Sequence, residues 1–219
     1  MEMTAMATFI NQTFATYDYA ILQALHNLAE GIGSVATPFL KFISILGEDG
    51  LFLIILSLIF MLFKKTRKVG ICMFGAIGCG AIITNFVLKD WIARPRPFYE
   101  LNKPFKEWWQ FIGGEPKTSF SFPSGHVTAT MAAMMSVFLL CNKKYSWTGF
   151  LFVALMGISR NYLMVHYPSD VLAGIISGAI AGTIAYGVTI LIYNFLEKFK
   201  DNKLCMFIKD FDLIKLFQR

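Results

Sequence analysis

Long runs of residues without a charged side chain are the feature that most constrains how this chain can fold. Two runs, Val69 to Leu88 and Val171 to Ile192, reach the roughly 20 residues that an apolar helix needs to cross a bilayer. Three shorter runs, at 50–63, 124–141 and 147–158, approach this length. Of the 219 residues, 56% are hydrophobic and only 16% are charged, which is too apolar for an ordinary soluble domain. The sequence therefore predicts an all-α fold, a polytopic membrane helical bundle with five to six spans.

The N-terminal residues 1–47 differ from these runs because their spacing places apolar and polar side chains on opposite faces of a helix. Within residues 19–32 an apolar face lies opposite a polar face that includes His26, which we expect to be solvated. The same pattern restarts after Pro38. These patterns predict two amphipathic helices that lie in the membrane interface. A single kinked span over about residues 18–46 is the alternative, because the interior of a bundle can shelter polar groups.

The whole chain, residues 1–219, is expected to form a single domain. The interfacial helices are followed by a spanning bundle with the active site at 48–195 and by a cytoplasmic tail at 196–219. In the last long run Gly174, Gly178 and Gly182 recur every four residues, which predicts a packing seam along one helix face. In the tail an amphipathic stripe begins at Leu204 and is interrupted at Lys215, which predicts a surface helix.

Basic residues are distributed unevenly along the chain. The net charge is +6, but no basic stripe with interleaved aromatic residues is present, so nucleic-acid binding is not expected. Compact basic clusters at 64–68, at 143–144 and from Lys198 onward are expected to face the cytoplasm. Alternating spans then place residues 89–122 and 165–170 together on the outer side. The cations in the first of these segments suit an anionic ligand.

Three polar motifs lie at the outer ends of the predicted spans. The first, KDWIARPRP, follows the run that ends at Leu88 and places Lys89 and Arg96 seven residues apart, with Pro97 next. Both side chains carry positive charge, and the arginine fork can hold two phosphate oxygens at once. This motif therefore predicts a site for an anionic group at the membrane surface.

The second motif is Pro123-Ser124-Gly125-His126, directly before an apolar run. Ser124 can cap the helix that begins there. Gly125 lets the backbone come close to an oxyanion, and the first free N–H groups of the helix point toward it. His126 near this helix start is a candidate for proton transfer.

The third motif runs from Ser159 to Asp170 and contains Arg160 and His166 between two apolar runs. The four-residue spacing lets Asp170 approach His166 across one helical turn, with Pro168 at the helix start. In phosphate chemistry a neutral imidazole attacks phosphorus, while a carboxylate fixes the tautomer of the ring. Polar side chains at the edge of a bilayer more often have a function than not.

Together the motifs resemble the three signatures of the type 2 phosphatidate phosphatase superfamily, also called the lipid phosphate phosphatase family. The patterns Lys-x6-Arg-Pro, Pro-Ser-Gly-His and Ser-Arg-x5-His-x3-Asp occur in the family order and without substitution. The resemblance covers roughly residues 85–175. Within the family, the chain is most similar to short bacterial members of the undecaprenyl-diphosphatase type.

The resemblance implies a role for each motif residue. His166 is the expected nucleophile that forms a phosphohistidine, Asp170 orients its ring, and His126 is the expected general acid. The expected phosphate-binding residues are Lys89, Arg96, Ser124, Gly125 and Arg160, with Pro97, Pro123 and Ser159 in support. No metal or other cofactor is expected, because three cations can do the work that Mg²⁺ does in other phosphoryl-transfer sites. Two histidines predict a bell-shaped pH profile of kcat/KM.

The expected activity is hydrolysis of a membrane lipid phosphate or diphosphate, at an active site on the extracytoplasmic face of a multi-pass cell-membrane protein. Undecaprenyl diphosphate is the preferred substrate, with Arg94 as a candidate cation for its second phosphate. Phosphatidylglycerophosphate and phosphatidate are alternatives. Another class of function is a non-catalytic protein that binds or translocates a lipid phosphate. Vanadate-dependent haloperoxidases have a similar constellation, but they are soluble, so the predicted spans disfavour them.

Overall fold

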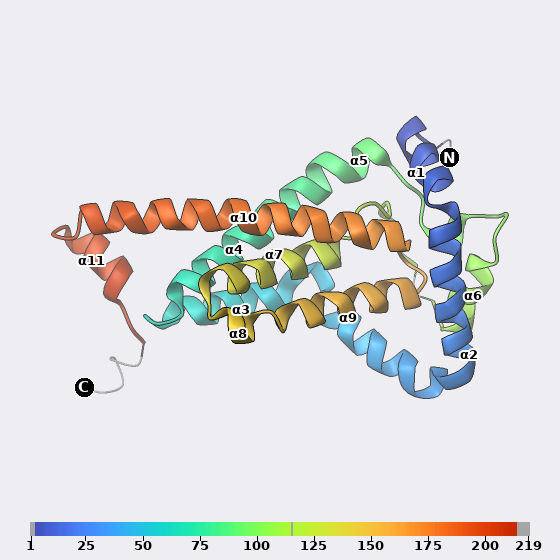
Figure 1. The fold of residues 1–219 in the computed structure, drawn as a ribbon, viewed down its shortest axis with the longest axis horizontal. Coiled ribbons are helices and arrows are strands. Elements are labelled where there is room, and N and C mark those ends of the chain that lie inside the picture. The colour runs from blue at the N-terminus through green and yellow to red at the C-terminus, as the bar shows by residue number, and fades with distance from the viewer. Residues whose placement is uncertain (1–2, 115, 214–219) are drawn as a thin grey trace.

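The computed structural model describes residues 3–114 and 116–213. Every regular element in these residues is helical (Figure 1). The larger helices are α2 (Ala15–Leu46), α3 (Leu51–Leu62), α4 (Arg67–Ala81), α7 (Gly125–Leu140), α9 (Gly149–Tyr162) and α10 (Pro168–Lys198). The shorter elements are α1 (Ala5–Thr13), η1 (Glu48–Gly50), η2 (Ile82–Leu88), α5 (Lys89–Ile92), η3 (Pro97–Tyr99), α6 (Phe105–Phe111), α8 (Lys143–Ser146) and α11 (Lys203–Asp210). The predicted tail helix is α11, and Lys215 lies outside the described residues.

Three helical stretches are long and apolar enough to cross a membrane by length and composition: Ala15–Leu46, Arg67–Tyr99 and Pro168–Lys198. In the second stretch, α4 continues through the π-helical segment η2 into α5. Lys89 therefore lies within a continuing helix rather than just beyond its end. The shorter apolar helix α7 packs between α4 and α10. These helices confirm the predicted all-α polytopic membrane bundle.

Helix α10 packs against α7 along the three regularly spaced glycines. A Cβ atom at Gly178 would lie 2.5 Å from the carbonyl oxygen of Thr128, and one at Gly174 would lie 2.9 Å from that of Ser124. A Cβ atom at Gly182 would meet another side chain of α7 at 2.7 Å. The two backbones therefore approach too closely for larger side chains, which is the packing seam that the sequence predicts.

Another face of α10 is exposed and apolar. Its side chains also recur every four residues: Leu172, Ile176, Ile180, Ile184, Val188 and Ile192. A continuous apolar stripe of this length on the outside of a bundle is suited to contact with lipid chains. One helix thus combines a close helix contact with a surface for the bilayer.

Replacement of Gly178 by alanine is expected to destabilise the bundle by about 1–3 kcal/mol, because the new methyl group meets backbone atoms of α7. The midpoint of thermal unfolding in detergent measures this effect. Gly187→Ala is the matched control on the same helix, since a Cβ atom there meets nothing within 4 Å. Equal unfolding midpoints for the two variants would contradict the close approach at Gly178.

Helix α2 contains two helical segments that meet at a kink, so the two helices expected near the N-terminus are joined end to end. It continues through Pro38 and breaks at Ile32, where φ is −131° and ψ is 22°. The first segment ends where the first expected helix ends, at Ile32, whereas the expected restart after Pro38 is wrong because Pro38 lies inside the second segment. The N-terminal half of α2 lies across the end of the bundle (blue in Figure 1). By length and composition alone, the whole of α2 could cross a membrane.

The segment between η3 and α7 packs on α2 rather than standing free. The ring of His26 in α2 stacks on Trp108 of α6 with the centroids 4.8 Å apart, and its side chain is only 13% exposed. The expectation of a solvated His26 is therefore wrong, because α6 covers it. Further along, the Lys41 Nζ atom donates to the carbonyl oxygen of Gly113 at 3.2 Å.

The two ends of the bundle differ in the elements that they hold. Figure 1 shows the α3–α4 turn, α8 and the C-terminal end of α10 at one end. These are the positions of the three predicted basic clusters. The connection between α9 and α10 lies at the opposite end, beside α2 and α6. The basic clusters and the polar motifs are thus separated along the bundle, as the alternation of spans predicts.

Candidate active site

A cavity of about 300 Å³ lies at the end of the bundle that holds the polar motifs. Its walls come from η1, α4, η2, α5, the loops before η3 and α7, the start of α7, the end of α9 and the loop before α10. Six of the residues expected at the site line this cavity: Lys89, Arg96, Gly125, His126, Arg160 and His166. Three motifs that lie far apart in the sequence therefore contribute to one cavity.

His166 and Asp170 lie one turn apart at the start of α10. The Nδ1 atom of His166 is 3.6 Å from Oδ2 of Asp170. The same oxygen accepts a hydrogen bond of 2.8 Å from the backbone N–H of Tyr167. Pro168 occupies the first position of α10, so the chain enters the helix with its φ angle already fixed. This local geometry directs the carboxylate toward the imidazole ring.

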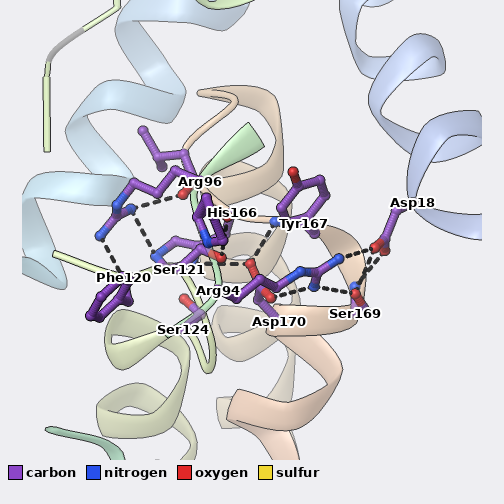
Figure 2. Close-up of polar contacts among 12 residues, drawn as sticks. Asp18, Arg94, Arg96, Phe120, Ser121, Ser124, His166, Tyr167, Ser169 and Asp170 are labelled. Atoms are coloured by element: carbon purple, nitrogen blue, oxygen red, sulfur yellow. Dashed lines mark hydrogen bonds and ion pairs between the residues drawn. The ribbon is translucent and has the colours of Figure 1, made fainter. Parts of the chain in front are cut away.

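The surroundings of His166 favour its neutral form. Burial lowers the pKa of His166 well below its ordinary value, and the charges of Arg96, Arg160 and Lys89 lower it further. Its Nε2 atom lies 3.4 Å from Nη1 of Arg96 (Figure 2). A neutral imidazole with a free electron pair among three cations can attack an electrophile that carries negative charge.

The arginines of the cavity are fixed by other parts of the chain. Arg96 donates from Nε to the carbonyl oxygen of Ser119 at 2.7 Å and from Nη1 to that of Val165 at 2.8 Å. Arg160 donates from Nη1 to the hydroxyl of Ser44 in α2. Cations that are already oriented need little rearrangement when an anion binds.

His126 faces a carboxylate that the sequence analysis did not assign to the site. Its Nε2 atom is buried without a hydrogen-bond partner and lies 4.0 Å from Oε2 of Glu48. Lys117 donates from Nζ to Oε1 of Glu48 at 2.9 Å and forms an ion pair with it. Glu48, Asp49 and Lys117 all line the cavity. The Glu-Asp-Gly turn at the end of α2 is the sequence signal that points to this position.

A second cavity of about 110 Å³ adjoins the first and shares Glu48, Lys117 and Arg160 with it. Lys41 contributes a further positive charge to its wall. Apolar side chains complete the lining: Ile45, Ile112, Leu163 and Val165. The second cavity therefore combines cations with an apolar wall beside the histidine pair.

Other expected site residues lie outside both cavities. Ser124 occupies the position before α7, but its hydroxyl forms no capping bond, so the expected cap is absent. Its backbone N–H instead donates to the carbonyl oxygen of Asp170 at 3.1 Å. Ser159 donates to the carbonyl oxygen of Leu40 at 2.8 Å and so ties α9 to α2. Pro97 begins η3, and Pro123 directly precedes Ser124.

Arg94 is not available for a second phosphate, contrary to the sequence expectation. Its side chain is 1% exposed, and Figure 2 shows it between Asp18 and Asp170. Nη2 donates to Asp18 at 2.9 Å, Nη1 to Asp170 at 2.6 Å, and Nε to Asn11 at 2.7 Å. Its guanidinium carbon also lies 3.8 Å from the ring centre of Tyr167. All three nitrogen atoms thus bind protein groups.

Comparison with known proteins shows which family shares this arrangement. Residues 69–194 match the family model described as the PAP2 superfamily. An undecaprenyl-diphosphatase from Sulfolobus acidocaldarius is 33% identical over 140 residues, which cover 63% of this chain and 63% of that protein. A lipid A 4'-phosphatase from Porphyromonas gingivalis is 30% identical over 176 residues, or 77% of this chain and 74% of that protein.

A solved structure supports the same family assignment. The crystal structure of a transmembrane PAP2 type phosphatidylglycerolphosphate phosphatase from Bacillus subtilis aligns with a TM-score of 0.63 and 26% identity. The alignment covers 84% of this chain and 90% of that one. The family match spans more than half of the sequence, contains all three motifs, and includes the two histidines and three cations that line the larger cavity. The chain therefore belongs to the PAP2 superfamily.

Proposed function

We propose that this protein is a metal-independent phosphatase of membrane lipids that acts through a phosphohistidine intermediate. One observation carries the proposal: a single cavity gathers His126 and His166 with the side chains of Lys89, Arg96 and Arg160. Such a set combines a nucleophile, a proton donor and charge stabilisation for phosphoryl transfer. The names of the relatives support a lipid phosphate as the substrate class.

In the first step, the electron pair on Nε2 of His166 forms a bond to phosphorus while the bond from phosphorus to the leaving oxygen breaks. His126 gives its proton to that oxygen, so the lipid leaves as an alcohol or as a lipid phosphate. Asp170 faces Nδ1 of His166 at 3.6 Å and stabilises the positive charge that develops on the ring. The three cations neutralise charge on the phosphoryl oxygens.

In the second step, water attacks the phosphorus atom of the phosphohistidine. His126, now neutral, accepts a proton from this water, and the bond between phosphorus and Nε2 breaks. Inorganic phosphate leaves, and His166 returns to its neutral form with its electron pair restored. Both histidines are then ready for another turnover.

Undecaprenyl diphosphate is the preferred substrate in this proposal, with phosphatidylglycerophosphate and phosphatidate as alternatives. The adjoining cavity with Lys41 and Lys117 supports a substrate that carries two phosphates. One phosphate would lie beside His166, and the other would lie near Arg160, which lines both cavities. The apolar wall of the second cavity suits the start of a lipid chain.

The position of the basic clusters supports an active site on the extracytoplasmic face of the membrane. The clusters lie at the end of the bundle opposite the polar motifs (Figure 1). Short loops rich in lysine and arginine tend to remain in the cytoplasm. The cavity would then open to the outer leaflet, where it would meet lipid phosphates of that leaflet.

The experiment that tests the proposal offers the three lipids in parallel to the purified protein in detergent with EDTA and follows released phosphate. We expect phosphate release from undecaprenyl diphosphate in the presence of EDTA, at a higher rate than from the other two lipids. Activity that EDTA abolishes and Mg²⁺ restores would contradict a metal-independent reaction. Equal rates on the three lipids would contradict the preference for a diphosphate. Absence of release from any lipid would instead favour a binding or translocating protein.

The pH profile tests the state of His166. A nucleophilic histidine reacts when neutral, that is, above its pKa, and the environment lowers the pKa of His166. We therefore expect the acidic limb of kcat/KM to lie below about 6.5, the ordinary pKa of histidine. Lys89→Gln should move this limb toward higher pH on the same substrate, because Lys89 lowers the pKa of His166. An acidic limb that stays in place in this variant would contradict the assignment.

A further inference from the structure

Asp18, outside the family-matched region, belongs to a buried cluster that reaches the candidate nucleophile. It lies in the N-terminal half of α2 and is 3% exposed. Oδ2 of Asp18 accepts from Arg94 at 2.9 Å and from the hydroxyl of Ser169 at 2.7 Å, while Oδ1 accepts from the backbone N–H of Ser169 at 2.8 Å. The cluster continues to Asp170, which is fully buried. Figure 2 shows this chain of contacts from Asp18 to His166.

The contacts divide the two oxygens of Asp170 between two tasks. Oδ1 accepts from Nη1 of Arg94 at 2.6 Å, which fixes the plane of the carboxylate. Oδ2 accepts from the backbone N–H of Tyr167 and faces Nδ1 of His166, and the Ser121 side chain also interacts with the carboxylate. A change in the position of Arg94 would therefore turn the carboxylate that faces the imidazole. Because Asp18 accepts from both Arg94 and Ser169, it ties the first turn of α10 to α2 and orients the guanidinium of Arg94.

The charge of Asp18 is a second way in which this residue can act on His166. Arg94 alone beside Asp170 would make a neutral pair, and a neutral pair stabilises a positive imidazole less than a carboxylate does. When both carboxyl groups are ionised, the group of two carboxylates and one guanidinium carries a net negative charge. This charge lies on the Nδ1 side of His166, opposite to Arg96 at its Nε2 side. It favours the positive charge that the ring gains when Nε2 bonds to phosphorus.

We propose that Asp18 is a positioning residue for His166. Asp18 acts through Arg94, Ser169 and Asp170, so that helix α2 completes the active site. The inference rests on the proposed function. A merely structural role would make Asp18 one more tie between α2 and α10. The two roles differ in what the isosteric variant Asp18→Asn does to turnover once the protein is folded.

In the positioning role, Asp18→Asn lowers kcat by about 10- to 100-fold with KM nearly unchanged, because a small displacement of the reacting groups has an effect of this size. The matched control is Arg67→Lys. Arg67 is 5% exposed and, like Arg94, ties distant segments together: its Nη1 atom donates to the carbonyl oxygens of Ile208 and Lys209. It lies at the opposite end of the bundle. Both variants are assayed below their unfolding temperatures, where the control should keep the kcat of the unchanged protein.

A second measurement needs no turnover. The chain contains three histidines, so the ring nitrogens can be followed by nitrogen-15 NMR and assigned with His26→Gln and His126→Gln. Asp18→Asn should shift the Nδ1 resonance of His166, and Arg67→Lys should not. An unchanged kcat or an unchanged His166 resonance in Asp18→Asn would overturn the inference. If the unchanged protein releases no phosphate from any lipid, the proposed function fails, and the resonance alone decides whether Asp18 positions the ring.

Discussion

Replacement of His166 by alanine is expected to lower kcat by about 10⁴-fold or more, because in the proposed mechanism it removes the atom that bonds to phosphorus. The expected loss is large because the remaining cations can bind the phosphate but cannot form the covalent intermediate. Two measurements test it: the rate of phosphate release, and the label that stays on the protein when radiolabelled substrate is quenched in alkali. The alanine variant should hold no label.

His26→Ala is the control for this variant. His26 stacks on Trp108 and lines neither cavity, so its loss should leave turnover near that of the unchanged protein. If His166→Ala turned over lipid as fast as His26→Ala, the phosphohistidine mechanism would be wrong. A labelled His166→Ala protein would place the covalent bond on another residue.

Replacement of Arg160 by alanine is expected to lower kcat/KM by about 10³-fold, the upper range for loss of one donor to a transition-state anion. Arg160 lines both cavities, so the loss should be larger for a lipid diphosphate than for a lipid monophosphate. Arg160→Lys keeps the charge but loses the planar fork, so its activity should fall between that of the unchanged protein and that of Arg160→Ala. Phosphate release at several substrate concentrations separates kcat from KM.

Arg67→Lys again serves as the control for a buried arginine. It should lower the unfolding temperature without a change in the ratio of the rates on the two kinds of lipid. Equal losses on diphosphate and monophosphate in Arg160→Ala would contradict a second phosphate position near this residue. Full activity in Arg160→Lys would show that charge alone is needed there.

The main features of the cavity are predictable from the sequence because they depend on short spacings. The four residues between His166 and Asp170 span one helical turn, and Pro168 marks where the helix begins. The long uncharged runs predict which segments form the bundle, and the basic clusters predict which helix ends lie together. Gly178 and its neighbours predict a close helix contact without any knowledge of the partner helix.

The different fates of Arg94 and Arg96 are not predictable in this way. The two arginines are separated by one proline, yet one is enclosed by carboxylates and the other faces the cavity. The turn between α5 and these residues depends on Ala93, which has a φ angle of 50°. An alanine rarely adopts this left-handed conformation, so no local preference indicates it. The partner of Arg94 in α2 lies far away in the sequence and becomes adjacent only through the fold.

Glu48 shows a different limit. Glu48 lies just before the apolar run that begins at Gly50, so the sequence indicates only that it forms the polar end of a span. In the structure, Asp49 and Gly50 both have positive φ angles, and the tight turn that they form brings Glu48 to the wall of the cavity. The Asp-Gly pair is typical of such a turn. Its direction relative to His126 depends on how α2 and α7 pack.

The length of α3 has a consequence for the bilayer around the cavity. Its 12 residues begin directly after the turn that lines the cavity. They rise about 18 Å, well short of the hydrocarbon thickness of about 30 Å. The bilayer beside a short helix becomes locally thinner, which brings the lipid headgroups closer to the midplane. A phosphate on such a lipid would approach the depth of the cavity while its chains stayed in the apolar layer, so local thinning would bring lipid phosphates closer to His166.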